Sequence, residues 1–522
     1  MTVRPSPSQR RLAVAVLVAL ASVAVADPAS GPTAALPSTR PQLRAAPRPS
    51  SQAQARPDPL LAAGMDQVMA LSPPDSCLTV AIDGAVRYRY NRDRPLVPAS
   101  TEKLITASVA LDQLGREHRF RTTVVAARPP RNATVTGDLT LVGGGDPQLT
   151  SSIYRGARPL DPSRPSTSLD DLAAKVAASG VRHVTGRVVG DERRYDQARV
   201  VPSWPPNYAA EQQAGPLSAL DVDDGYTLRP VAGGFARDRS PDPAAAAAAT
   251  FTALLRVRGV RVDGAPGSGR APGGSSPVAS IESAPLGQLV TDMLSHSDNQ
   301  TAELLAKELG RRVGHGTTAA GATVISRWRA THGLAPAGAT TVDGSGLDRG
   351  NRVTCDELTT VLGLGGGRAG VIAGGLPVAA TSGTLIARFR GSPAAGRLRA
   401  KTGSLNGVTA LVGFVDLPDG AIATFAYLAN GAPITASVLA AQDYLGTLLA
   451  GYRPPCPKAT AHRIVAPISP SAVAVALLLA GPGAFGALPA TVASVDAIQR
   501  LGPTLADRCT AADDAVTFAL DP

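Results

Sequence analysis

Three short runs near residue 400, the last two of them largely apolar, constrain the fold most. They lie at 396–403, 408–417 and 421–430, and each has the length of a strand. The tripeptide Pro418-Asp419-Gly420 supplies a tight turn between the last two. The run 434–452 follows with an apolar helical pattern. The sequence therefore predicts three successive strands and a closing helix in this part of the chain.

A second set of elements is predicted nearer the N-terminus. The stretch 77–91 alternates in places around a glycine turn, which is typical of a hairpin. A helix is predicted to open at Ser100 and to end at Gly115, because glycine is a favoured C-cap. Its apolar stripe consists of Leu104, Ala107, Leu111 and Leu114.

The segment 121–275 has a different character. Short β-like runs alternate with Gly/Pro loops, so we interpret the segment as an inserted, mainly β module. The runs predicted as strands are 121–127, 133–147, 183–192 and 250–264. Helical patterning returns at 284–310, where a polar break separates two apolar stripes.

The N-terminal residues predict export. Three arginines in the first eleven residues precede fifteen uncharged, mostly apolar residues that end in Ala24-Val25-Ala26. This order is typical of a secretory signal peptide at residues 1–26, with an uncleaved anchor as the alternative. Residues 27–59 are rich in Pro, Ala and Ser, and we interpret them as a flexible linker.

The last segment, 453–522, allows two interpretations. Its residues 464–495 carry no charge and are numerous enough to span a bilayer, but four prolines interrupt them. A membrane anchor and a poorly ordered apolar tail both fit this pattern. We expect an exported protein on the extracytoplasmic side of the cell envelope, with membrane anchoring as one of the two alternatives.

Cysteine usage and charge limit the partners. The four cysteines permit disulfides in an exported protein, with three possible connectivities. The sequence has neither a C-x-x-C nor an H-E-x-x-H pattern, so we expect no metal and no other cofactor. The net charge of +10 favours anionic partners, but the basic residues are scattered. We therefore expect no nucleic-acid partner.

Lysine is scarce, with five lysines among 51 basic residues, and one of them follows Ser100 by three positions. Residues i and i+3 share a helix face, so the amine of Lys103 can reach the Ser100 hydroxyl. A serine needs a nearby base to become a nucleophile, and a buried lysine can lose its proton whereas arginine cannot. The pattern suggests a Ser–Lys pair, although S-x-x-K alone also arises by chance.

The polar break contains a second motif, Ser297-Asp298-Asn299. Ser297 could relay protons, and Asn299 could hydrogen-bond a substrate amide. On these residues alone, a helix N-cap is the simpler interpretation.

A third motif, Lys401-Thr402-Gly403, ends the first of the three predicted strands, and Ser404 follows it. Lys401 and Thr402 can bind a substrate carboxylate, and Gly403 lets the backbone approach the substrate. The N–H groups of Ser404 and Ser100 can stabilise an oxyanion. The alternative is an ordinary turn at the end of a strand.

The order and context of the three motifs resemble penicillin-binding proteins and serine β-lactamases. The stretches 141–150, 343–354 and 383–415 closely resemble the D-Ala-D-Ala carboxypeptidase/endopeptidase family, the class C low-molecular-mass penicillin-binding proteins. The long gap between Ser100 and Ser297 fits that family, because its members insert extra domains there. Family members more often have serine at the position of Asp348.

The resemblance implies an α+β fold. A β-lactamase/transpeptidase-like domain, with an antiparallel sheet flanked by helices, would be formed by residues 60–120 and 276–452, with the module 121–275 inserted. The resemblance also implies a serine-type D-Ala-D-Ala carboxypeptidase, with endopeptidase activity as a further expectation. Its partners would be peptidoglycan stem peptides ending in D-Ala-D-Ala, and β-lactams would acylate the same residue, Ser100, with Lys103 as the base.

Two rival functions use the same features differently. A serine β-lactamase or esterase could be built on this scaffold, but the large insertion argues against it. A non-catalytic cell-wall binding protein would have no need of three intact motifs.

Overall fold

The computed structural model describes residues 58–157 and 164–453. The predicted signal peptide, nearly all of the linker and nearly all of the apolar C-terminal segment lie outside these residues. Within the two described ranges, no helix is both long enough and apolar enough to cross a membrane.

A five-stranded antiparallel sheet lies at the centre of the domain that carries the motifs. The three strands predicted near residue 400 lie beside the predicted N-terminal hairpin, which confirms both predictions. In spatial order the strands are β15 (Leu398–Leu405), β16 (Val408–Asp416), β17 (Ile422–Asn430), β1 (Asp75–Ile82) and β2 (Ala85–Tyr90). Strand β15, which carries Lys401-Thr402-Gly403, therefore forms one edge of the sheet.

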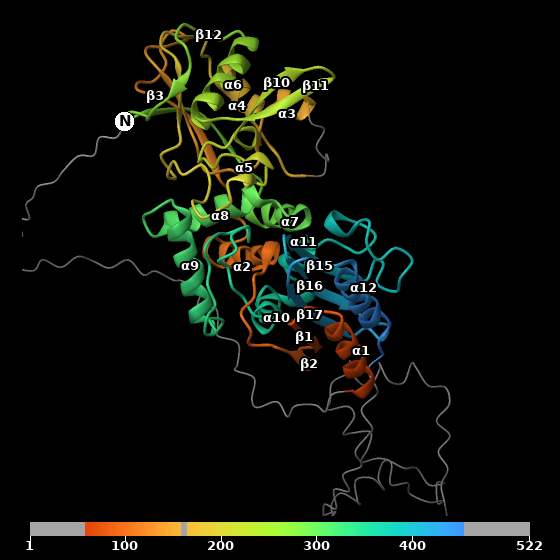
Figure 1. The fold of residues 1–522 in the computed structure, drawn as a ribbon. Helices are drawn as coiled ribbons and strands as arrows, with labels where there is room; N and C mark the ends of the chain where they lie inside the picture. Colours follow the sequence, from red (N-terminus) through yellow and green to blue (C-terminus); the bar gives the residue numbers. More distant parts are fainter. Residues whose placement is uncertain (1–57, 158–163, 454–522) are drawn as a thin grey trace, which may run out of the picture. The chain divides into compact units, whose positions relative to one another are not determined.

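Helices cover both faces of this sheet (Figure 1). Because side chains alternate along a strand, Val412 and Phe414 of β16 pack towards one helical layer, and Leu411 and Val415 pack towards the other. The first layer contains α2 (Glu102–Leu114), α7 (Leu286–His296), α8 (Asn299–Arg312), α9 (Thr318–Thr331) and α10 (Cys355–Leu364). The second layer contains α1 (Pro59–Ala70) and α12 (Ala436–Gly451). The α+β fold with a helix-flanked antiparallel sheet is confirmed.

A disulfide joins Cys77 of β1 to Cys355 of α10, which lie 278 residues apart in the sequence. Both cysteines are buried in the core between the sheet and the first helical layer. This pair belongs to one of the three possible connectivities. Cys456 and Cys509 lie outside the described residues.

The inserted module has a core of its own. Its main sheet has the order β13–β9–β5–β3–β14, and β9 pairs in parallel with both of its neighbours. A smaller parallel sheet has the order β12–β8–β4. These strands are β3 (Arg121–Ala126), β4 (Thr134–Val135), β5 (Leu139–Val142), β8 (His183–Val184), β9 (Val188–Asp191), β12 (Arg261–Val262), β13 (Gly267–Ser268) and β14 (Ser276–Glu282).

Helices α4 (Leu169–Ala178) and α6 (Pro243–Val257) contribute to the same core. The remaining helices and strands of the module are short: α3 (Ser152–Ala157), α5 (Asn207–Ala210), β6 (Leu149–Thr150), β7 (Thr167–Ser168), β10 (Tyr226–Val231) and β11 (Gly234–Arg239). One more short helix, α11 (Val371–Gly375), belongs to the first domain and packs on α7.

One prediction in this module is wrong. The run 250–264, expected to be a strand, mostly continues helix α6, and only β12 within it is a strand. The side chain of Asp242 caps the helix by accepting from the N–H of Ala245, and Pro243 occupies the first helical position. A run of alanines then propagates the helix into the expected strand. The module thus contains substantial helix as well as strands, and β14 extends its main sheet beyond residue 275 to Glu282.

Candidate active site

Ser100 lies in a short 3-10 turn, Ala99–Thr101, that leads directly into α2. The residue before it, Ala99, has a φ of 48°, in the left-handed region that an alanine rarely adopts. Such outliers persist where the surrounding structure holds them, and they concentrate at functional sites. The Ser100 side chain is only half-buried and is therefore accessible at the start of the helix.

The amine of Lys103 is fully buried and has three oxygen partners. Its Nζ lies 3.0 Å from Ser100 Oγ, 2.6 Å from Asn299 Oδ1 and 2.7 Å from the carbonyl oxygen of Ser345. The last two oxygens can only accept hydrogen bonds. A neutral lysine that donates its two N–H groups to them is left with one lone pair, and that lone pair points at the Ser100 hydroxyl.

The environment of Lys103 makes the neutral form accessible. Burial lowers its pKa to about 8, while the carboxylates of Asp343 and Glu303 act in the opposite direction. The charged form is disfavoured because the side chain has lost its water shell. The predicted neighbours Ser100 and Lys103 are thus brought together with the amine poised near neutral pH.

The second motif forms a helix cap and also reaches the Lys103 amine. Ser297 ends α7 with a φ of 58°, and Asp298 caps α8 by accepting from the N–H groups of Gln300 and Thr301. Asn299, the first residue of α8, is the one that reaches Lys103. Ser297 lies at the same break, but in the described part of the chain no hydrogen bond joins its hydroxyl to Ser100 or Lys103.

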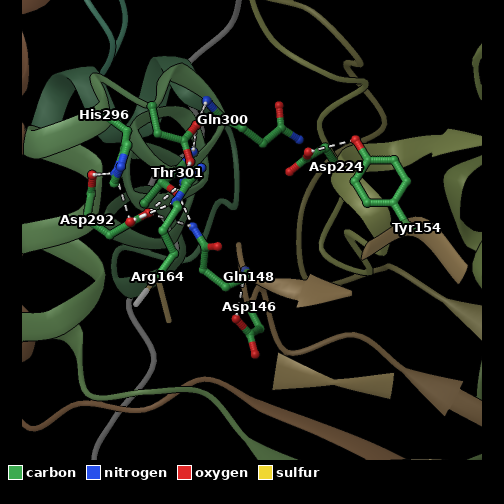
Figure 2. Close-up of polar contacts among 10 residues, drawn as sticks. Asp146, Gln148, Tyr154, Arg164, Asp224, Asp292, His296, Gln300 and Thr301 are labelled. Carbon is green, nitrogen blue, oxygen red and sulfur yellow. Dashed lines mark hydrogen bonds and ion pairs between the residues drawn. The ribbon is translucent and has the colours of Figure 1, made fainter. Parts of the chain in front are cut away.

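A polar network from the inserted module surrounds this break (Figure 2). Arg164 donates two hydrogen bonds to the buried Asp292 of α7, at 2.9 and 2.8 Å. His296 lies 2.9 Å from the same carboxylate. Gln148 lies between Asp292 and Thr301 and donates to both, at 3.5 and 3.3 Å. The module thereby holds the end of α7 and the start of α8, on either side of the second motif.

The third motif lies against the nucleophile turn. A Cβ at Gly403 would lie 2.7 Å from the carbonyl oxygen of Pro98 and 3.2 Å from the Cβ of Ala99, so the close approach requires glycine. Lys401 is fully buried, and its Nζ donates to the carbonyl of Thr402 at 3.0 Å. Burial, and then the charge of nearby Lys103, holds the pKa of Lys401 well below its usual value.

Backbone groups at the open edge of β15 follow from its pairing. The carbonyl of Leu398 accepts from Ala379, and the N–H of Ala400 donates to Pro377, so both groups point away from β16. In an antiparallel pair this direction repeats every second residue. The N–H groups of Thr402 and Ser404 therefore also point to the open edge, where an extended peptide could pair with them.

Sequence reasoning missed the turn that supplies the Ser345 carbonyl. Buried Asp343 holds this turn by accepting from the N–H groups of Gly346 and Asp348, at 2.8 and 2.6 Å. The indole N–H of Trp204, from the inserted module, donates to the same carboxylate at 2.8 Å. The glycine-rich stretch 343–348 is the signal in the sequence that indicates such a turn. Asp348, the departure from the family pattern, is buried within this loop.

The inserted module also contacts the second motif directly. The side-chain amide of Asn299 donates to the carbonyl of Gln213 at 2.7 Å while its oxygen accepts from Lys103. Further along α8, Glu308 accepts two hydrogen bonds from Arg194, at 2.9 and 2.6 Å. Through Gln213, which holds Asn299, and Trp204, which holds Asp343, the module supports two of the three oxygens around the Lys103 amine. Among the described residues, no group of His, Cys, Asp and Glu side chains could hold a metal ion.

Known proteins resemble this chain along most of its described length. The model of the D-Ala-D-Ala carboxypeptidase 3 (S13) family matches residues 76–236 and 230–448. A D-alanyl-D-alanine carboxypeptidase from Actinomadura sp. is 34% identical over an alignment of 462 positions, and the match covers 72% of this chain and 83% of that protein. A carboxypeptidase DacB from Mycolicibacterium smegmatis is 33% identical and covers 70% of this chain and 78% of its own length.

Solved structures support the fold. Penicillin binding protein 4 (dacB) from Haemophilus influenzae superposes with a TM-score of 0.62 at 21% identity, covering 74% of this chain and 98% of that one. A complex of the same protein with a β-lactam gives a TM-score of 0.56 at the same identity and coverage.

Proposed function

Because the chain belongs to the D-Ala-D-Ala carboxypeptidase 3 (S13) family, we propose that it is a penicillin-binding D-Ala-D-Ala carboxypeptidase that acts through an acyl-enzyme on Ser100. One observation carries the assignment of the site. The buried Lys103 amine lies 3.0 Å from Ser100 Oγ, and its two other partners are obligate acceptors. That arrangement suits an amine that takes the serine proton.

Acylation would proceed as follows. The Ser100 oxygen attacks the carbonyl of the penultimate D-Ala as its proton passes to Lys103 Nζ. Negative charge develops on the carbonyl oxygen, which the N–H groups of Ser100 and Ser404 would stabilise. The C–N bond then breaks, and the leaving D-Ala amine takes a proton, with Ser297 as the proposed relay. Water later attacks the ester, releases the shortened peptide and restores Ser100.

Substrate binding would use the open edge of the sheet. An extended stem peptide can pair with the N–H groups at the edge of β15, and its terminal carboxylate would meet Lys401 and Thr402. The substrate carboxylate would offset the cost of burying the positive charge of Lys401. Asn299 would hydrogen-bond a peptide amide, and Gly403 leaves room for the substrate backbone beside the nucleophile turn.

The peptidoglycan substrate implies action outside the cytoplasm, and the predicted signal peptide at residues 1–26 supports that location. For residues 464–495, a membrane anchor and a poorly ordered apolar tail stay the two alternatives. Endopeptidase activity on peptide cross-links is a second proposed activity, because the same acylation chemistry opens either amide bond.

The test is to incubate the full chain with a stem pentapeptide and, separately, with a cross-linked muropeptide, and to identify the products by mass spectrometry. We expect loss of one D-Ala from the pentapeptide with the wild type and not with Ser100→Ala. Absence of D-Ala release, with rapid and repeated turnover of a chromogenic β-lactam, would favour the β-lactamase instead. Absence of any turnover or covalent labelling by penicillin would favour the non-catalytic protein.

A further inference from the structure

The turn that presents the Ser345 carbonyl to Lys103 is held by a second acid, Glu303 of α8. One carboxyl oxygen of Glu303, Oε1, accepts from the N–H of Gly344 at 3.1 Å and from the N–H of Ser345 at 2.8 Å. The side chain is fully buried. The carbonyl of the next peptide, between Ser345 and Gly346, is the one that accepts from Lys103 at 2.7 Å.

Glu303 and Asn299 share one face of α8. They are four residues apart, which places their side chains one turn apart on the same side of a helix. Asn299 supplies one acceptor for the Lys103 amine directly, and Glu303 holds the N–H of Ser345, the residue whose carbonyl supplies the other. A single helix face thus contributes to the placement of both acceptors of a neutral Lys103.

We propose that Glu303 is a positioning residue for acylation: it holds the 344–345 turn so that Ser345 accepts one N–H of Lys103 and the amine lone pair is directed at Ser100. This inference rests on the proposed roles of Ser100 and Lys103. The turn has other supports, because Thr106 donates to the carbonyl of Gly344 at 2.7 Å and Asp343 accepts from Gly346. In the structure, however, Glu303 is the side chain that accepts from the N–H of Ser345 itself.

The contact that Glu303 makes with the turn needs an acceptor oxygen and not a charge. Burial raises the pKa of Glu303 to about 8, with Asp343 acting in the same direction, so the neutral carboxyl is accessible near neutral pH. Its second oxygen, Oε2, has no hydrogen-bond partner among the described residues. A glutamine can therefore replace the anchoring oxygen, whereas leucine removes it, and aspartate is one methylene too short to reach the turn.

The experiment follows covalent labelling of the full-length protein by a fluorescent penicillin, and it separates the dissociation constant of the non-covalent complex from the first-order acylation rate constant. We expect Glu303→Leu to slow acylation by about 100-fold, as a misdirected catalytic group typically does. Its dissociation constant should stay near that of the wild type, because the carboxylate-binding residues are untouched. Glu303→Gln should restore most of the rate, and Glu303→Asp should remain slow.

Glu308→Leu is the matched control. It also removes a buried acid from α8, but Glu308 pairs with Arg194 and does not touch the 344–345 turn. We expect lower stability with an acylation rate near that of the wild type in the folded protein. An acylation rate in Glu303→Asp or folded Glu303→Leu equal to the wild type, or Glu303→Gln as slow as Glu303→Leu, would overturn the inference. Absence of a penicillin adduct on Ser100 in the wild type would instead defeat the proposed function.

Discussion

At position 103, lysine and arginine differ in whether the side chain can accept a proton. Both can donate to Asn299 and Ser345, but arginine stays protonated in proteins and cannot accept a proton from Ser100. In a chain that otherwise relies on arginine, the lysine at this position supplies a property that arginine lacks.

Replacing Lys103 by arginine tests that property. We expect Lys103→Arg to lower the acylation rate constant by about 10²–10⁴-fold, the usual contribution of a general base. The measurement is the rate of labelling by fluorescent penicillin. Lys175→Arg is the control, because Lys175 is exposed and donates to the carbonyl of Ser280, away from Ser100. Equal rates for Lys103→Arg and the wild type would remove Lys103 from the mechanism.

The pH dependence of acylation follows from the same amine. Burial lowers the pKa of Lys103 to about 8, and only the neutral form can take the serine proton. Below this pKa the amine is mostly protonated, so the acylation rate should fall about tenfold for each pH unit and should level off above it. Stopped-flow labelling at a series of pH values on both sides of the pKa measures how the acylation rate changes with pH. A rate that is constant through it, or that rises as the pH falls, would contradict the role of a neutral Lys103.

Some site residues can be predicted from sequence and others cannot. Ser100 and Lys103 are three residues apart at the start of a helix, and this spacing brings their side chains together. The pair can therefore be predicted from the sequence. The carbonyl of Ser345 is invisible there, because every residue has one and only the fold decides which carbonyl meets the amine. The proposed role of Glu303 depends on that carbonyl, so it could not be predicted from the sequence either.

At the scale of elements, the contact between β15 and the nucleophile turn carries the most consequence. The N–H groups of Ser100 and Ser404 can share one oxyanion only if this strand and this turn lie close together. Gly403 permits that approach because it has no Cβ to meet Pro98.

Adding one methyl group tests this contact. Gly403→Ala should force the strand and the turn apart and slow acylation by about 100-fold, measured with fluorescent penicillin. Gly363→Ala is the control, because a Cβ there meets no heavy atom within 4 Å and the residue lies in helix α10. We expect it to leave acylation unchanged and to stabilise the protein by about 0.5–1 kcal/mol. Wild-type rates in Gly403→Ala would show that the close contact is not needed.

Elements with a clear period were predictable, and one element at a compositional boundary was not. The strands at 396–430 and the helices on either side of Ser297 follow simple apolar patterns. Helix α6 differs from the prediction because the β-branched and aromatic residues at 250–257 favour a strand locally, whereas the capped alanine run before them propagates the helix through this stretch. Helix α1 was not predicted, because its sequence directly follows the linker.

At the scale of the molecule, one disulfide closes the chain around the site. The Cys77–Cys355 bond joins β1 to α10 and encloses Ser100, the inserted module and the second motif in a single loop. Sequence could supply the four cysteines but not this pairing, since pairing depends on which elements the fold makes neighbours.

Removal of this disulfide should destabilise the whole domain. We expect the Cys77→Ala/Cys355→Ala double variant to lose about 2–5 kcal/mol of unfolding free energy, because a long loop is no longer closed in the unfolded chain. Denaturant unfolding of the wild type and the variant measures the difference. The acylation rate of the folded variant should stay near the wild-type value, because neither cysteine touches the Lys103 amine. An unchanged unfolding midpoint would contradict the expected role of the bond.

The most direct test of the whole account is the site of covalent attachment. After brief incubation of the full chain with penicillin, the protein is digested and the peptide that contains Ser100 is analysed by mass spectrometry. The account predicts one penicilloyl adduct on Ser100 in the wild type and none in Ser100→Ala. An adduct on another residue, or labelling that persists in Ser100→Ala, would contradict it.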